Sequence, residues 1–263
     1  MKTALKSLLR KALFPALYWR EYGYRKIFIF KRPAIARLPM GHVLVVAPHP
    51  DDDVLACGGL LAQMADKDNV TVCFVTNGER GLAGFTTNLA KETREEEAKT
   101  ALKSLGITST AFFRLKDGSV SLDVDHLARS IRTLIVQADH ILLPALEDMS
   151  SDHFHTTITV LKVLKAMKTR DSAAKTLWFY EVWSPNVANV LIDISSVVDQ
   201  KLAAIRCHKS QLEAIDYDAK LIGLNAYRSI TAYDKSVTHC EAYLKCTVAG
   251  GLRLAKMWTK SDE

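Results

Sequence analysis

The chain has 263 residues, of which 48% are hydrophobic and 24% charged, and these proportions exclude a disordered chain and fit a soluble globular protein with a sizeable core. A net charge of +6 suits anionic partners such as phosphate groups or a membrane surface, but no segment resembles a nucleic-acid module, so we expect no nucleic-acid partner. The five cysteines include no CxxC pair, which favours buried, reduced thiols in a cytoplasmic protein.

The N-terminal segment is basic. Apolar residues fall at helical spacing in its first 20 positions, and Lys6, Arg10 and Lys11 lie between them. Because these charges interrupt the apolar run, we expect neither a signal peptide nor a membrane-spanning helix here. Two interpretations stay open: a helix packed on the domain, or an amphipathic helix lying peripherally on the inner membrane face. We therefore divide the chain into a helical extension, 1–38, and one domain, 39–263.

Predicted strands and helices alternate through the domain. The expected strands are Val43–Ala47, Val70–Thr76, Thr110–Leu115, Ile141–Pro144, Thr176–Trp183 and Val190–Ile194. The expected helices are Val54–Ala65, Lys91–Leu105, Val124–Val136, Thr156–Met167, Ser196–Gln211 and Val237–Leu244. This alternation predicts an α/β fold with helices on both faces of the sheet, and ligands in such folds bind at the carboxyl ends of the strands.

A polar cluster, His49-Pro50-Asp51-Asp52-Asp53, directly follows the first predicted strand. Imidazole and carboxylate groups are the ligands of catalytic zinc sites, which usually take three protein ligands and a water. One carboxylate could bind the metal while its neighbour acts as a base. The alternative is an Asp-rich turn that caps the next helix.

A second cluster follows the fourth predicted strand. Its members are Asp148, Ser150, Ser151, Asp152, His153, Phe154 and His155. Since both clusters follow strands, they can meet at one edge of the sheet, where His153 would complete a His₂Asp set with His49 and Asp52. His153 alone would indicate no more than a polar residue at a helix start, but the first cluster favours a metal site.

These residues resemble the signatures of a known family. Ala47–Asp53 is similar to the (A/P)HPDD(E/D) signature of the PIG-L/LmbE-like de-N-acetylases. Further similarities follow in the family's order over Val43 to Gln211. The segment Thr76-Asn77-Gly78-Glu79 is similar to a T(D/N)GE turn, and Arg94 to Gly106 is similar to a helix with the pattern RxxExxxAxxxLG. Asp152-His153 is similar to a DH motif, and a VDIS…K…HxSQ stretch is matched by Asp193, Lys201, His208, Ser210 and Gln211.

The resemblance implies a Rossmann-like, mostly parallel sheet and a single catalytic zinc ion. It makes His49, Asp52 and His153 the metal ligands and Asp51 the general base. The implied reaction is hydrolysis of an N-acetyl group from an amino sugar or glycoconjugate, which releases acetate and a free amine.

Other site residues have weaker support. The resemblance makes Arg94 and Asp117 substrate-binding residues, although a helix-surface charge and a turn carboxylate are the alternatives. The chain departs from the family at Ser150, where many members carry the first His of an HxDH pattern, a residue implied to stabilise the oxyanion or protonate the leaving amine. His155 and His208 are candidates for this acid or oxyanion role, and polar helix residues are their alternative interpretation.

Rival functions remain at this level. One is another metal-dependent amide or ester hydrolase, and a second is a degenerate, non-catalytic carbohydrate-binding module. A nucleotide-binding Rossmann protein is disfavoured because no GxGxxG follows the first strand. Trp178, Tyr180 and Trp183 could stack on a sugar ring or belong to the core.

Overall fold

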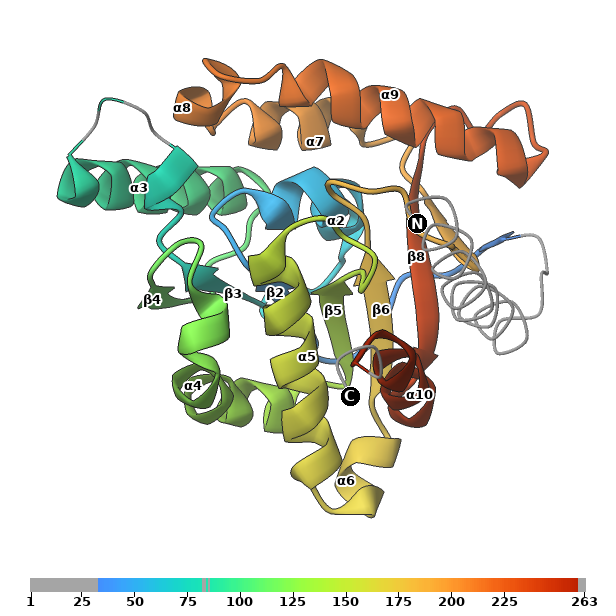
Figure 1. The fold of residues 1–263 in the computed structure, drawn as a ribbon. Helices are drawn as coiled ribbons and strands as arrows, with labels where there is room; N and C mark the ends of the chain where they lie inside the picture. The colour runs from blue at the N-terminus through green and yellow to red at the C-terminus, as the bar shows by residue number, and fades with distance from the viewer. Residues whose placement is uncertain (1–32, 82–83, 85, 260–263) are drawn as a thin grey trace, which may run out of the picture.

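Val43–Ala47 (β2) is buried at every residue, as expected for a central strand that is covered on both faces. The computed structural model describes residues 33–81, 84 and 86–259, and in this part of the chain β2 belongs to an eight-stranded sheet (Figure 1). The other strands are β1 (Ala34–Ile35), β3 (Val70–Thr76), β4 (Thr110–Leu115), β5 (His140–Pro144), β6 (Thr176–Tyr180), β7 (Val190–Asp193) and β8 (Cys240–Thr247).

The strand order is β1-β7-β8-β6-β5-β2-β3-β4, and every neighbouring pair is parallel except the two that involve β8. From β2 the chain runs outward through β3 and β4, and then returns to place β5 on the other side of β2. This reversal is the switch point at which α/β sheets open a crevice for ligands. The predicted Rossmann-like, mostly parallel fold is therefore confirmed.

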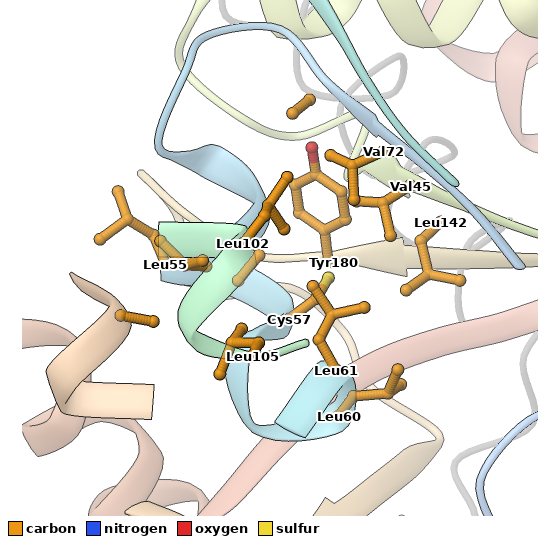
Figure 2. Close-up of a cluster of buried hydrophobic side chains, with 14 of the residues drawn as sticks. Val45, Leu55, Cys57, Leu60, Leu61, Val72, Leu102, Leu105, Leu142 and Tyr180 are labelled. Carbon is orange, nitrogen blue, oxygen red and sulfur yellow. The ribbon is translucent and has the colours of Figure 1, made fainter. Parts of the chain in front are cut away.

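Helices cover both faces of the sheet (Figure 1). One face carries α2 (Asp52–Gln63), α3 (Thr87–Ser104), α7 (Val198–Ile205) and α9 (Tyr217–Ser229), and the other carries α4 (Val124–Gln137), α5 (Ser151–Ala166) and α10 (Val248–Thr259). Two short helices, α6 (Thr169–Ala173) and α8 (Lys209–Leu212), lie in connections. Each face has its own apolar core, and Figure 2 shows the first, in which Leu61 of α2 and Leu102 of α3 lie near Val45 and Tyr180 of the sheet.

The helix predicted over Val237–Leu244 is wrong, because this segment enters β8, an antiparallel strand between β6 and β7. The sequence pattern is misleading at Glu241, because this residue is a carboxylate in the buried first part of β8. Its Oε1 atom lies 2.7 Å from Nζ of Lys201, and it accepts backbone N–H groups of Gly59 and Leu60. A buried charge that is paired and hydrogen-bonded in this way is tolerated in a core.

Other element boundaries also differ from the prediction. The helix predicted from Thr156 begins five residues earlier, because Ser150 caps it by accepting the backbone N–H of His153. The helix predicted over Ser196–Gln211 is divided into α7 and α8, because the backbone of His208 leaves the helical region (φ −84°, ψ 58°). Helices α9 and α10 were not predicted.

The predicted N-terminal helix, residues 1–20, lies outside the described residues, so its contact with a membrane and the cytoplasmic location stay predictions. Residues 34–35, which the predicted division assigns to the extension, form the edge strand β1 and pair with β7. The division at residue 38 itself stays a prediction. Within the described part of the chain, no helix is long and apolar enough to cross a bilayer.

Candidate functional site

Two neighbouring strands bring the polar clusters together. β2 and β5 are adjacent and parallel, so the loop that follows β2 and the start of α5 meet at one edge of the sheet. Asp52 is the first residue of α2, and His153 lies in the first turn of α5. The predicted meeting of His49, Asp52 and His153 therefore has a simple cause in the strand order.

Three donor atoms of these residues form a nearly equilateral triangle. Nδ1 of His49 lies 3.2 Å from Oδ2 of Asp52 and 3.2 Å from Nε2 of His153, and the latter two atoms are 3.0 Å apart. Tetrahedral zinc with bonds of about 2.0–2.1 Å would separate its ligand atoms by roughly 3.3 Å. The set of two imidazoles and one carboxylate thus fits a zinc ion in both chemistry and spacing, and could hold a metal ion.

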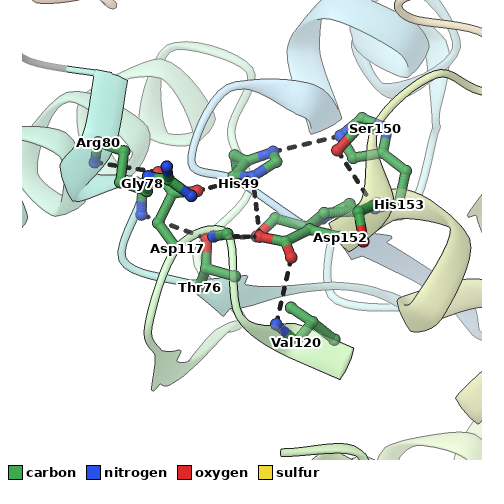
Figure 3. A network of polar contacts seen from close by, with 12 residues as sticks. His49, Thr76, Gly78, Arg80, Asp117, Val120, Ser150, Asp152 and His153 are labelled. Atoms are coloured by element: carbon green, nitrogen blue, oxygen red, sulfur yellow. Dashed lines mark hydrogen bonds and ion pairs between the residues drawn. The ribbon is translucent and has the colours of Figure 1, made fainter. Parts of the chain in front are cut away.

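In both imidazoles, the ring nitrogen that is not part of the donor triangle also lies near a carboxylate. Nδ1 of His153 lies 3.2 Å from Oδ2 of Asp148. Nε2 of His49 lies 3.4 Å from Oδ1 of Asp117 and 3.5 Å from Oδ2 of Asp152, and Figure 3 shows both side chains directed toward this ring. A carboxylate on the second nitrogen fixes the tautomer and the orientation of a metal-binding imidazole.

Backbone groups hold Asp117 and Asp152 in place. Asp152 accepts the N–H groups of Gly118 at 2.7 Å and Val120 at 3.2 Å, while Asp117 accepts the N–H of Arg80 at 3.0 Å. These contacts fasten the loops after β3 and β4 against the start of α5. Asp117 contacts His49 and the loop backbone and also lines a pocket beside His49, so its predicted part in substrate binding stays a prediction.

Asp51 lies beside Arg94. Nη2 of Arg94 is 3.0 Å from Oδ2 of Asp51, and the guanidinium also donates to the carbonyl oxygens of Pro50 and Gly78. Burial raises the pKa of the Asp51 carboxyl, and the charge of Arg94 opposes this rise. A buried carboxylate with a raised pKa suits a general base.

The pKa values of His49 and His153 are both raised by neighbouring carboxylates. Burial lowers the pKa of His153, but the charge of Asp52 and the contact with Asp148 outweigh burial and raise it to about 9. The pKa of His49 is likewise raised, because contacts with Asp117, Asp152 and Asp52 outweigh its burial. Since a metal ion competes with these protons, binding should release protons to the solvent.

The two other candidate histidines lie in different surroundings. His208 is buried, its ring nitrogens have no hydrogen-bond partner among the described residues, and burial lowers its pKa to about 3, aided by the charge of Arg94. His155 is more exposed, and its Nδ1 contacts the carbonyl oxygen of Ser151 at 2.8 Å. Their acid or oxyanion roles stay predictions.

Asp53 completes the run of three aspartates but faces the core. It is fully buried, and burial raises the pKa of its carboxyl well above the usual range, so we expect it to be neutral. Trp178 and Tyr180 are also buried, which prevents stacking on a sugar ring, whereas Trp183 is 41% exposed and lies edge-on to Tyr217.

Several motif residues connect helices to one another. Ser210 donates through its backbone N–H and its hydroxyl to Glu97, which joins α8 to α3, and Lys201 joins α7 to β8 through Glu241. Sequence reasoning noted Asp148 but assigned it no role. Its position directly after β5, in the same cluster as His153, was the available signal.

Comparisons with known proteins agree with this geometry. The family model described as PIG-L: GlcNAc-PI de-N-acetylase matches residues 44–164. A Bacillus cereus protein named as a probable N-acetyl-alpha-D-glucosaminyl L-malate deacetylase is 31% identical over 198 residues, which cover 68% of this chain and 89% of that protein. The chain belongs to the PIG-L/LmbE-like de-N-acetylase family.

Two further comparisons concern the fold and the names of other similar proteins. The crystal structure of the N,N'-diacetylchitobiose deacetylase from Pyrococcus horikoshii covers 95% of this chain and 94% of its own with a TM-score of 0.65, at 19% identity. A Pseudomonas putida protein named 4-oxalmesaconate hydratase is 27% identical over 73% of this chain and 83% of its own length. Deacetylases among the relatives support a hydrolase that acts on an amide bond.

Proposed function

We propose that this protein is a zinc-dependent de-N-acetylase that removes the acetyl group from an N-acetylated amino sugar or glycoconjugate. One observation carries the proposal: the donor triangle of His49, Asp52 and His153 has nearly the edge lengths of a tetrahedral zinc site, and Asp51 adjoins it in sequence. The names of the deacetylase relatives support the amide bond and the amino sugar.

His49, Asp52 and His153 would hold the ion, which when bound supplies a Lewis acid for activating water and polarising the acetyl oxygen. Asp51 takes the proton of the attacking water as the hydroxyl adds to the acetyl carbon. The same carboxyl then delivers this proton to the nitrogen as the C–N bond breaks, which gives acetate and a free amine. Arg94 holds the Asp51 carboxylate in position.

With Ser150 in place of a histidine, the second proton transfer is proposed to fall to Asp51. A neutral His208 could donate an N–H to the developing oxyanion, since its pKa of about 3 leaves it uncharged near neutral pH. Trp183 is 41% exposed, and its backbone N–H donates to Asp148, so its ring is proposed to contact the sugar.

The test is acetate release from N-acetylglucosamine conjugates: free, phospholipid-linked, nucleotide-linked and oligomeric, each with chelated protein and after zinc is restored. Zinc-dependent release from one conjugate would support the proposal and name the substrate class. Zinc bound at one equivalent without release would redirect the assignment to another amide or ester. Neither zinc binding nor release would favour a degenerate carbohydrate-binding module.

A hydratase is the second candidate, because the Pseudomonas putida relative bears that name. Hydration also needs an activated water and a base, so the same residues could serve it. An unsaturated dicarboxylic acid added to the panel would separate the two reactions, since hydration removes its ultraviolet absorbance and releases no acetate.

A further inference from the structure

A pocket of about 430 Å³ opens beside the donor triangle. Its lining residues are His49, Arg80, Gly81, Asp117, Gly118, Ser150, Ser151 and Asp152. Most of its lining residues are polar or charged, and Arg80 is its one arginine or lysine. A substrate whose acetamide lies at the donor triangle would extend past His49 into this pocket.

Both the backbone and the side chain of Arg80 make contacts that fix its position. Its backbone N–H donates to Oδ2 of Asp117 at 3.0 Å (Figure 3). Its side chain lies against Gly118. A methyl group on Gly118 would lie 1.8 Å from Nη1 of Arg80, so the absence of a side chain there gives the guanidinium its place. Gly118 also has φ +74°, which favours glycine independently.

The guanidinium of Arg80 has no carboxylate partner in the described part of the chain. The two nearby carboxylates have other contacts, since Asp117 is engaged by the backbone and His49, and Asp152 by His49 and two backbone N–H groups. Arg80 is exposed, and other exposed arginines of the described chain, such as Arg253, also have no carboxylate within ion-pair distance, so what distinguishes Arg80 is its place in the pocket lining beside His49.

We propose that Arg80 binds an anionic substituent of the substrate, a carboxylate or a phosphate, in this pocket. The planar guanidinium offers paired N–H donors that match the oxygens of either group, and such charge-assisted hydrogen bonds are stronger than neutral ones. The proposal rests on the proposed function, because it assumes that His49 marks the reacting end of the substrate. It makes Arg80 a specificity-determining residue that contributes to binding and not to the chemical step.

The experiment compares three probes on the zinc-loaded full chain: N-acetylglucosamine 1-phosphate, N-acetylglucosaminyl malate and the neutral methyl N-acetylglucosaminide. Dissociation constants come from calorimetry, and acetate release is followed in parallel. The variants are Arg80→Gln and Arg80→Lys, with Arg253→Gln as the matched control because Arg253 is an exposed arginine on α10.

We expect Arg80→Gln to weaken binding of at least one anionic probe by about 10- to 100-fold, the usual effect of losing a hydrogen bond to a charged group. Binding of the neutral probe should not change, Arg80→Lys should recover part of the loss, and Arg253→Gln should behave like the native protein. The anionic probe that is affected identifies phosphate or carboxylate as the ligand.

Equal loss for neutral and anionic probes, no loss for either anionic probe, or the same loss in Arg253→Gln would overturn the proposal. Failure of the proposed function gives a different result. In that case no probe releases acetate, while the calorimetric comparison of Arg80→Gln with the native protein still decides whether Arg80 binds the anion.

Discussion

Asp152 contacts His49 through Oδ2, which lies 3.5 Å from Nε2 of the imidazole, while both carboxylate oxygens accept backbone N–H groups of the loop after β4. This arrangement favours a proton on Nε2 and leaves Nδ1, the atom of the donor triangle, free to bind a metal ion. In the PIG-L/LmbE-like family the residue two positions before Asp152 is often histidine, and here it is Ser150. Asp152 contacts His49 directly, so it can orient the His49 imidazole although Ser150 replaces the family's histidine.

Replacing Asp152 with Asn should therefore weaken metal binding. We expect the dissociation constant for zinc to rise by about 10- to 100-fold, the usual effect of losing a carboxylate behind a histidine ligand. Competition with a chromogenic chelator measures this constant, and Asp125→Asn on α4 is the matched control. If Asp152→Asn melts at the native temperature and its dissociation constant for zinc is unchanged, Asp152 holds the loop after β4 but does not support metal binding.

Replacing Asp51 with Asn should separate metal binding from turnover. The donor triangle does not include Asp51, so we expect zinc to remain at one equivalent while acetate release falls by about 10²- to 10⁴-fold, as for loss of a general base. Metal analysis and the acetate assay on the same preparation measure both quantities. Full activity in this variant would rule out Asp51 as the base.

Removing the charge of Arg94 should move the acid limb of the pH–rate profile. Burial already raises the pKa of Asp51 and Arg94 opposes it, so Arg94→Met should raise this pKa further and move the acid limb of kcat/KM to higher pH. At a fixed pH on that limb, a pKa higher by about one leaves roughly tenfold less ionised base. Arg94→Lys keeps a positive charge and should move the limb less. If the acid limbs of the native protein and of Arg94→Met lie at the same pH, the charge of Arg94 does not affect the pKa of Asp51.

His208 should make the fold less stable in mild acid. Its pKa is about 3 in the folded protein and near its ordinary value of 6.5 after unfolding, so the unfolded chain binds the extra proton between these values. Stability is therefore complete above about pH 6.5 and decreases as the pH falls toward 3, by roughly 2 kcal/mol at about pH 5.

The variant His208→Leu removes this titration. Its free energy of unfolding, from urea denaturation at about pH 7.5 and pH 5, should fall by roughly 2 kcal/mol less than that of the native protein over the same interval. All other titrating groups are shared, so they cancel in the comparison. Parallel pH dependence in the two proteins would mean that His208 reaches solvent or gains a partner when it is protonated.

The strands nearest the site were predictable because each is a short apolar run. Val43–Ala47 and Val70–Thr76 were predicted with the bounds that the structure has, and the clusters after the first and fourth predicted strands meet as expected. The α/β fold is confirmed by the sheet, and family membership by the similarity to known deacetylases. The roles of Asp51 and the three candidate ligands stay predictions.

The features that the sequence could not indicate are contacts between residues that are distant along the chain. Glu241 is acceptable in a buried strand only because Lys201 lies 40 residues earlier and reaches it from α7. The pairing of Asp148 with His153, and of Asp117 with His49, likewise depends on the positions of loops that no local pattern specifies. Only the arrangement of the sheet places these groups in contact.

The central position of β8 has a consequence for the order in which the chain can fold during synthesis. The strands β2 to β5, of which β2 and β5 position the donor triangle, are neighbours in space and come from the first part of the domain, so they can assemble early. Among the strands of the described residues, β7 has no partner on its inner side until β8 has been made, and β1 pairs with β7 alone. A chain interrupted before residue 240 would therefore leave both strands, and an open edge of β6, available for pairing with other chains.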